Sequence, residues 1–222
     1  MNKLLSKTFI IAFLGLAITG CKNENNKAKT GDAQDAREAT LEAETFKVKT
    51  DESVIHWKGR KPTATHTGTI KLAEGSFKAN DSTIESGRFV IDMKSIEVSD
   101  LKGKDRSDLE AHLKGTVKGK EGDFFNTEEY PEATFEITDI TEENGQTMLS
   151  GNLTIKEETK NISFPVNITN RGDQVEISSN EFSIDRTNWK VNFGSKSVFD
   201  GLGDNFVYDD INLRLRLVAE KS

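Results

Sequence analysis

From Thr45 onward, hydrophobic residues alternate with polar residues in one short segment after another. The alternating hydrophobic positions are Phe46 and Val48; Ile55 and Trp57; Phe89, Ile91 and Met93; Phe135 and Ile137; Leu149, Gly151, Leu153 and Ile155; Ile162, Phe164, Val166 and Ile168; and Ile211, Leu213, Leu215 and Leu217. A period of two places every second side chain on the same face of a β-strand. Turn sequences such as Asn144-Gly145 separate these segments. The pattern therefore predicts consecutive antiparallel hairpins, with Pro165 indicating an edge or a bulge in its strand.

Strands with one apolar and one polar face must either close into a barrel or stack as two sheets. About eight antiparallel strands can form a barrel of the lipocalin type, whose interior holds one small or elongated ligand. A β-sandwich is the structural alternative, and the alternation alone separates the two only weakly. We expect an all-β fold and prefer an antiparallel, lipocalin-like β-barrel of about eight strands.

One stretch, residues 108–135, departs from the alternation. Leu109 and Leu113 stand four residues apart ahead of Gly115, which predicts a short helix with one apolar stripe near one end of the barrel. Phe124 and Phe125 follow in a loop. At the end of a barrel, these two rings either gate an apolar cavity or belong to the core.

The first 20 residues have the composition of a secretory signal peptide. Lys3 and Lys7 precede a run of ten mostly apolar residues, Phe9–Ile18, which is too short to span a bilayer. The small residues before Cys21 resemble a lipobox, at which bacterial lipoproteins are lipidated on the cysteine and cleaved. We therefore expect Cys21 to be lipidated, and multiple acyl chains would anchor the protein stably. The alternative is an ordinary signal peptide with an incidental cysteine.

Residues 21–44 are too polar to bury much surface, with Leu41 as their one large apolar side chain. Such a segment is expected to act as a tether that holds the domain away from the membrane. The predicted organisation is a lipoprotein signal peptide at 1–20, a polar tether at 21–44 and a barrel domain at 45–222.

Composition excludes several classes of function. The net charge is -7, and it becomes -9 without residues 1–20, so nucleic acid is not an expected partner. A single cysteine excludes an internal disulfide and a cysteine-based zinc cluster. The chain has no HExxH or GxSxG motif, so we predict no catalytic residue, no metal and no cofactor. The three histidines could suggest a metal or catalytic site. The alternative is that His56 and His66 form hydrogen bonds within a hairpin and that His112 is an exposed residue on a helix.

Several spaced motifs over residues 45–220 resemble the YceI-like family of bacterial lipid- and polyisoprenoid-binding proteins. They are His56-Trp57-Lys58-Gly59, His66-Thr67-Gly68 with Gly75-Ser76-Phe77, His112-Leu113-Lys114, Asp123-Phe124-Phe125, Tyr130-Pro131-Glu132-Ala133-Thr134-Phe135, Gly151-Asn152-Leu153-Thr154-Ile155 with Thr159-Lys160, and Phe182-Ser183-Ile184-Asp185-Arg186. The family's usual Asp-Phe-Gly after the last motif is replaced by Asn188-Trp189-Lys190, which leaves the shape of that loop open. The resemblance implies a barrel that binds an apolar ligand.

The aromatic residues are the main candidates for a ligand-binding wall. Thirteen phenylalanines against two tyrosines favour rings without a polar group, as an apolar pocket requires. The candidates for the wall are Phe77, Phe89, Phe124, Phe125, Phe135, Phe164, Phe182, Trp189 and Phe193. His56, His66 and Arg186 are candidates for contact with a ligand head group, although Arg186 also suits a salt bridge at the barrel rim. The alternative for the rings is a solid core without a cavity.

The sequence thus predicts a non-enzymatic carrier of a long apolar molecule in the bacterial cell envelope. The resemblance implies a polyisoprenoid, an isoprenoid quinone, or a fatty acid or amide as the ligand. Lys22 after Cys21 resembles the signal for the outer membrane. A homodimer is compatible with the sequence. The alternatives are an envelope module that binds proteins through the loops of a solid barrel, and a hydrolase whose site has no recognised motif.

Overall fold

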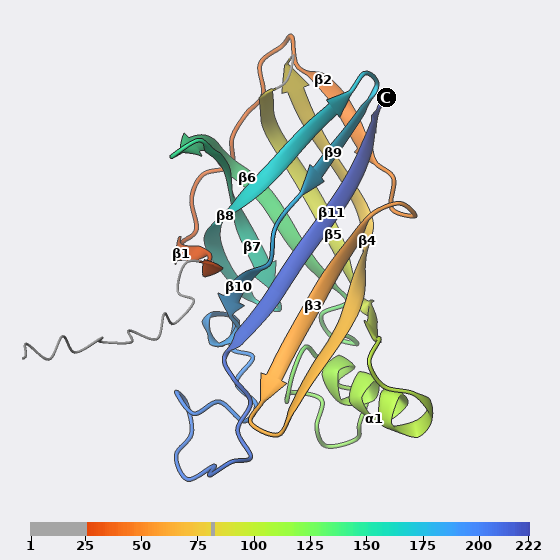
Figure 1. Cartoon of the computed structure of the whole chain (residues 1–222), viewed down its shortest axis with the longest axis vertical. Helices are drawn as coiled ribbons and strands as arrows, with labels where there is room; N and C mark the ends of the chain where they lie inside the picture. The colour runs from red at the N-terminus through yellow and green to blue at the C-terminus, as the bar shows by residue number, and fades with distance from the viewer. Residues whose placement is uncertain (1–25, 81–82) are drawn as a thin grey trace, which may run out of the picture.

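The computed structural model describes residues 26–80 and 83–222, and in these ranges the chain is almost entirely β-structure (Figure 1). The signal peptide and Cys21 lie outside the described residues. The strands are β1 (Lys29–Asp32), β2 (Glu44–Val48), β3 (Val54–Lys61), β4 (Ala64–Asn80), β5 (Thr83–Val98), β6 (Glu132–Glu143), β7 (Gln146–Ile155), β8 (Glu158–Arg171), β9 (Gln174–Ser178), β10 (Phe182–Asp185) and β11 (Asp210–Lys221). The helix α1 (Gly103–Lys114) and the 3-10 helix η2 (Arg186–Trp189) complete the described elements.

The strands close into a ring of eight positions, in which all neighbouring strands are antiparallel. The ring runs β4, β5, β6, β7, β8, β9, β11 and β3, and β3 returns to β4. At one end of the barrel β2 replaces β3 between β4 and β11, and at the other end β10 replaces β9 on β11. The prediction of an all-β barrel of about eight strands is confirmed. The described strands outnumber the eight positions because some short strands share one position in the ring.

β1 fills a gap that the other strands leave open. It pairs with residues 160–163 of β8, and the adjoining Lys27 bridges to Ser183 of β10. Ala28 is buried in the core. Pro165 lies between the parts of β8 that pair with β1 and with β9, where its missing N–H disturbs neither pairing.

Within the segment 21–44, which the sequence predicts to be a polar tether, the residues from Lys27 onward contact the barrel. The backbone N–H of Gln34 donates to Oδ1 of Asn152 at 3.0 Å, and Thr40 donates to the carboxylate of Glu85. Backbone pairing with an open strand edge stabilises this segment, although its side chains are polar. The low hydrophobicity that predicted a tether does not report on such pairing.

The barrel is filled at the end that carries β2 and the C-terminus. Phe46 stacks on Phe77 with ring centroids 5.2 Å apart. The rings of Phe89, Phe135, Phe164 and Phe182 form a continuous chain of contacts, with centroid separations of 6.3, 5.9 and 4.2 Å. This aromatic core leaves the opposite end of the barrel to be closed by other elements.

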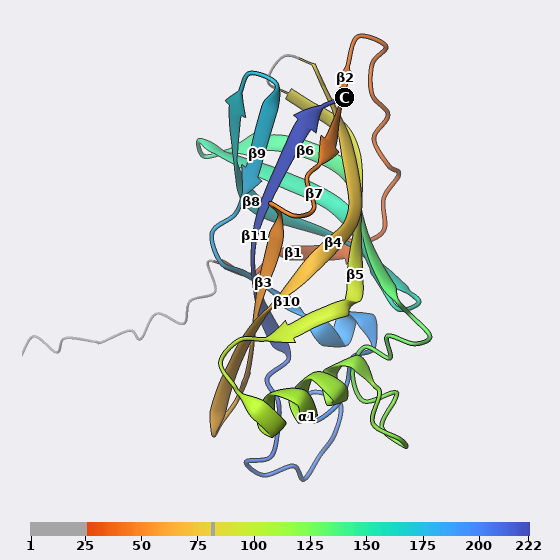
Figure 2. The same ribbon diagram turned by 90° about the vertical axis from the view of Figure 1, so that its right-hand side faces the viewer.

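The helix α1 lies across that opposite end (Figures 1 and 2). It ends at Gly115, whose left-handed backbone (φ 75°) favours glycine, as the sequence predicted. Leu109 and Leu113 pack against the barrel interior. Oε1 of Glu110 accepts hydrogen bonds from the N–H of Val98 at 2.9 Å and from Nε of Arg106 at 2.8 Å, so the helix is tied to the end of β5. No helix in residues 26–80 and 83–222 has the length and apolar character that a membrane span needs.

Candidate ligand cavity

A cavity of about 390 Å³ lies inside the barrel between the aromatic core and α1. Its wall is mostly aliphatic, and its strand residues come from β3, β4, β5, β6, β7, β10 and β11. The apolar lining residues are Ile55, Trp57, Ile70, Ile91, Met93, Ile96, Leu109, Leu113, Phe124, Phe125, Ala133, Leu153, Ile155, Ile184, Val191, Phe193, Val207, Ile211 and Leu213. A space of this size and lining suits a small apolar molecule.

The aromatic core is the floor of this cavity. Ile91, Ala133 and Ile184 line the cavity on β5, β6 and β10. Two residues deeper along the same strands, the next inward positions are Phe89, Phe135 and Phe182, all of them buried. Two residues span about 7 Å along a strand, so the change from cavity to solid core occurs within one layer of side chains.

A cluster of rings closes the other end of the cavity. Phe124 contacts His112 of α1 at a centroid distance of 5.1 Å and Phe193 at 5.2 Å. Phe125 lies beside Phe124, and its side chain lines the cavity. Phe124 is only 8% exposed, whereas Phe193 is 37% exposed. Side chains from α1 and two loops therefore cover this side of the mouth of the cavity.

The polar residues of the lining carry positive charge and hydrogen-bond donors. They are Arg60, Lys61, His66, His112, Arg186, Asn205 and Tyr208. Among the described residues, no aspartate or glutamate lines the cavity. The two histidines pair with carboxylates outside the lining, since Nδ1 of His66 lies 2.9 Å from Asp100 and Nε2 of His112 lies 2.7 Å from Asp123. These two pairs fix the histidine rings at the rim.

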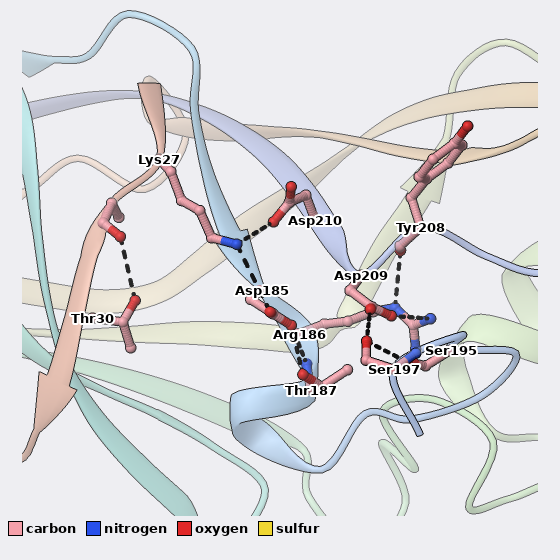
Figure 3. Close-up of polar contacts among 11 residues, drawn as sticks. Lys27, Thr30, Asp185, Arg186, Thr187, Ser195, Ser197, Tyr208, Asp209 and Asp210 are labelled. Atoms are coloured by element: carbon pink, nitrogen blue, oxygen red, sulfur yellow. Dashed lines mark hydrogen bonds and ion pairs between the residues drawn. The ribbon is translucent and has the colours of Figure 1, made fainter. Parts of the chain in front are cut away.

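Arg186 is the most buried charged residue of the described structure, at 2% exposure (Figure 3). Its guanidinium donates to the carbonyl oxygens of Tyr208, Val191 and Val207, and Nη2 lies 3.6 Å from the carboxylate of Asp209. Burial lowers the pKa of Arg186, and the nearby carboxylates oppose that effect. Because its donors face the protein backbone, Arg186 holds the loop after η2 against the barrel.

A second polar group at this end joins the N-terminal segment to the same loop region (Figure 3). Nζ of Lys27 lies 2.9 Å from Asp210 and 3.8 Å from Asp185. The other oxygen of Asp185 caps η2 by accepting from the backbone N–H and the hydroxyl of Thr187. Asp185 therefore connects the segment before β1 to the start of η2.

The candidate residues divide between the cavity and its surroundings. Phe124, Phe125, Phe193, His66 and Arg186 line the cavity. Six candidates for the wall lie in the filled part of the barrel, namely Phe77, Phe89, Phe135, Phe164, Phe182 and Trp189. Alternation tells which side chains point inward, but it does not tell at which depth the interior is filled.

His56 lies on the outer face of β3, one residue out of phase with Ile55 and Trp57. It borders a separate surface cleft with Lys58, Glu181 and Arg214. Burial and, next, the charge of Arg214 lower the pKa of His56. The structure does not bring His56 to the cavity, because neighbouring residues of a strand point to opposite faces.

The part of the lining that comes from the last loop and from the rim of the β3–β4 hairpin has no signal in the sequence. These residues are Arg60, Lys61, Asn205, Val207 and Tyr208. They stand in no alternating segment, so periodicity gives no signal for them. The alternation predicts that Trp57 points inward but does not predict a polar role for it. Its buried indole N–H has no acceptor among the described residues.

No group of three or more histidine, cysteine, aspartate or glutamate side chains in the described part of the chain could hold a metal ion. The ionisable residues of the lining are either hydrogen-bonded structural groups, as with His66, His112 and Arg186, or exposed cations at the rim, as with Arg60 and Lys61. The arrangement is suited to hold a molecule by apolar contact and by positive charge at one end.

A closed antiparallel barrel with an apolar cavity at one end defines a class of small barrels that enclose a ligand. The chain belongs to the YceI-like family, because the model of the YceI-like domain matches residues 46–219. The fold resembles BcnA of Burkholderia cenocepacia with a TM-score of 0.58 and 23% identity, over 77% of this chain and 98% of that one. It also resembles a polyisoprenoid binding domain of Saccharophagus degradans implicated in plant cell wall breakdown, with a TM-score of 0.55 and 13% identity, over 80% of this chain and 98% of that one. No curated protein matches the chain.

Proposed function

We propose that this protein binds one apolar chain molecule in the cavity under α1 and carries or sequesters it in the bacterial cell envelope. The proposal rests on one observation: one half of the barrel contains a cavity, whereas side chains fill the other half. Burial of apolar surface drives such binding, at about 25 cal/mol per Å² before the costs of ordering the ligand. The ligand classes considered are an isoprenoid, an isoprenoid quinone, and a fatty acid or amide.

Two further observations support the proposal. The YceI-like family assignment covers the whole barrel, and one protein of the same fold is described as a polyisoprenoid binding domain. Among the described residues, the lining offers no arrangement of a nucleophile with a base, which favours a binding role over an enzymatic one. Attachment to the outer membrane through a lipidated Cys21 is part of the proposal and is supported by the lipobox-like sequence.

Native mass spectrometry of the protein, gently purified from its own membranes, tests the proposal. The expected result is one hydrophobic adduct per chain, and uptake of a fluorescent isoprenoid by protein from which that adduct has been removed. A protein that is repeatedly empty and takes up no probe would instead favour a module that binds other proteins through its loops.

A matched pair of variants tests whether the ligand lies in the cavity. Ala133 lines the cavity, whereas Ala73 lies exposed on β4. Ala133→Phe places a ring in the cavity and should weaken binding enough to lose the adduct, and Ala73→Phe should retain it. Equal retention of the adduct by both folded variants would place the ligand elsewhere.

A further inference from the structure

Two properties of the cavity limit which molecule it can hold, namely its closed floor and the charges at its mouth. The floor is formed by Phe89, Phe135 and Phe182, which are 3%, 9% and 3% exposed. Behind Phe135 the core continues without a gap, because the ring of Phe164 lies 5.9 Å from it and stacks on Phe182. A ligand chain therefore cannot extend past this layer unless the aromatic core moves.

The volume above the floor sets a length. A methylene group takes up about as much space as a water molecule, whose share of the liquid is about 30 Å³, so a cavity of about 390 Å³ holds roughly 13 methylene groups. A long polyisoprenoid has several times as many carbons, and most of it would remain outside. The cavity thus matches a single chain of medium length.

The mouth sets the charge of the head group. Arg60 and Lys61, at the end of β3, are exposed and line the cavity, and neither forms an ion pair with another described residue. Arg60 lies over the ring of Tyr208 at 5.2 Å, a contact that positions the guanidinium without neutralising it. The lining residues His66, His112 and Arg186 already face the carboxylates of Asp100, Asp123 and Asp209. The unpaired positive charge at the mouth is therefore that of Arg60 and Lys61, and it favours a negatively charged group there.

We propose that the ligand is a single-chain amphiphile with about 13 buried carbons and an anionic head group, a carboxylate or a phosphate, at Arg60 and Lys61. The chain lies against the aliphatic wall with its tail at Phe135, and the head stays at the rim, where Asn205 and Tyr208 supply further polar contacts. The inference rests on the proposed binding function and narrows its ligand.

Titration calorimetry with two series of straight-chain probes tests the head group. Dodecanoic acid and dodecan-1-ol share a chain, and the acid is expected to bind about tenfold more tightly, as one charge-assisted hydrogen bond provides. The double variant Arg60→Gln and Lys61→Gln should remove this preference and leave the affinity for the alcohol unchanged. The matched control is Lys78→Gln with Arg88→Gln, which removes the same charge from the opposite end of β4 and β5.

Dodecyl phosphate in the same assay distinguishes the two anions. Tighter binding of the phosphate than of the acid assigns a phosphate head, and the reverse assigns a carboxylate. Equal binding of acid and alcohol to the wild type would overturn the anionic head group while leaving the binding function intact. Failure of every probe to bind would instead contradict the proposed function itself.

A series of acids from octanoic to icosanoic acid tests the length. Affinity is expected to rise about fourfold with each methylene, and to level off near 13 carbons, where the tail reaches the floor. Phe135→Leu should move this limit to longer chains, because it removes part of the floor. Phe46→Leu, the same change in the aromatic core away from the cavity, should lower stability and leave the limit in place. A steady rise in affinity through icosanoic acid in the wild type would overturn the length limit.

Discussion

Phe124 and Phe125 occupy neighbouring positions in one loop but differ in their surroundings. Phe124 contacts His112, Phe125 and Phe193 and is almost fully buried, whereas Phe125 is partly buried and lines the cavity. We expect Phe125→Ala to lower the free energy of unfolding by about 1 to 2 kcal/mol and to speed ligand release. Phe124→Ala should cost about 3 to 5 kcal/mol, as is usual for a buried ring.

Denaturant unfolding and stopped-flow release of a fluorescent ligand measure the two effects. A large loss of stability in both variants with unchanged release rates would show that both rings are core, and the entrance would have to be sought around residues 185–203.

Arg186 differs from every other cation near the cavity in being fully buried and bonded to three backbone carbonyls. Arg186→Met keeps much of the side-chain volume but leaves these carbonyls without donors and Asp209 without its cation. We expect a loss of about 3 to 5 kcal/mol in the free energy of unfolding, the usual cost of breaking a buried ionic group. Hydrogen exchange of residues 191–208 should rise more than that of β4, and a uniform rise would contradict the role of Arg186 in holding this loop.

At the scale of elements, two carboxylates attach α1 to β5: Glu110, which accepts from the N–H of Val98, and Glu97, which pairs with Arg106. Burial alone would raise the pKa of Glu110, but the hydrogen bonds from the N–H of Val98 and from Arg106 outweigh it, and the pKa lies below its ordinary value. The ionised form is therefore favoured in the folded protein. Its contribution to stability is present above the pKa that Glu110 has in the unfolded chain, and it is lost as the pH falls through the lower, folded value.

We accordingly expect release of an uncharged probe to accelerate when the pH falls into the range in which Glu110 takes up its proton. Glu110→Gln should release the probe quickly at neutral pH and show less dependence on pH. Stopped-flow release between neutral and acidic pH provides the measurement. An unchanged pH profile in this variant would mean that another group loosens the helix.

Strands and helices can be predicted from the sequence where residues close together in the chain define them. The alternation from Ile211 to Leu217 gave the inward face of β11, and Gly115 gave the end of α1. Gly151 continues the apolar face of β7 for a reason that periodicity does not supply, since a Cβ there would lie 2.3 Å from the ring of Phe135. Contacts of this kind decide which half of the barrel is solid, and they depend on residues far apart in the sequence.

β1 could not be predicted from the sequence. Its four residues are exposed and polar, and only the open edge of β8 makes them a strand. Similarly, the loop lining the cavity through Asn205, Val207 and Tyr208 is held by Arg186, a long-range contact with no sequence signature. The sequence therefore predicts the part of the candidate site formed by the helix and its aromatic loop. It does not predict the residues at the rim of the cavity.

For the whole molecule, the N-terminal segment belongs to the folded unit. A shortened chain beginning at Asn26 should be more stable than one beginning at Thr45 by about 2 to 4 kcal/mol, the contribution of a few backbone hydrogen bonds. The shorter chain also exposes the edges of β8 and β10, so we expect it to self-associate.

Thermal unfolding and analytical ultracentrifugation of the two shortened chains check this prediction. Equal stability and equal mass would show that β1 is dispensable for the barrel.

The pairing of β1 with β8 also limits the geometry that the proposed attachment through Cys21 would have. With Lys27 fixed to the barrel by Ser183, Asp185 and Asp210, only five residues separate the barrel from Cys21. Even a fully extended chain of six peptide steps reaches only about 20 Å. A barrel lipidated at Cys21, as proposed, would thus lie against the headgroups of its leaflet, close enough to exchange a bound apolar molecule with that leaflet directly.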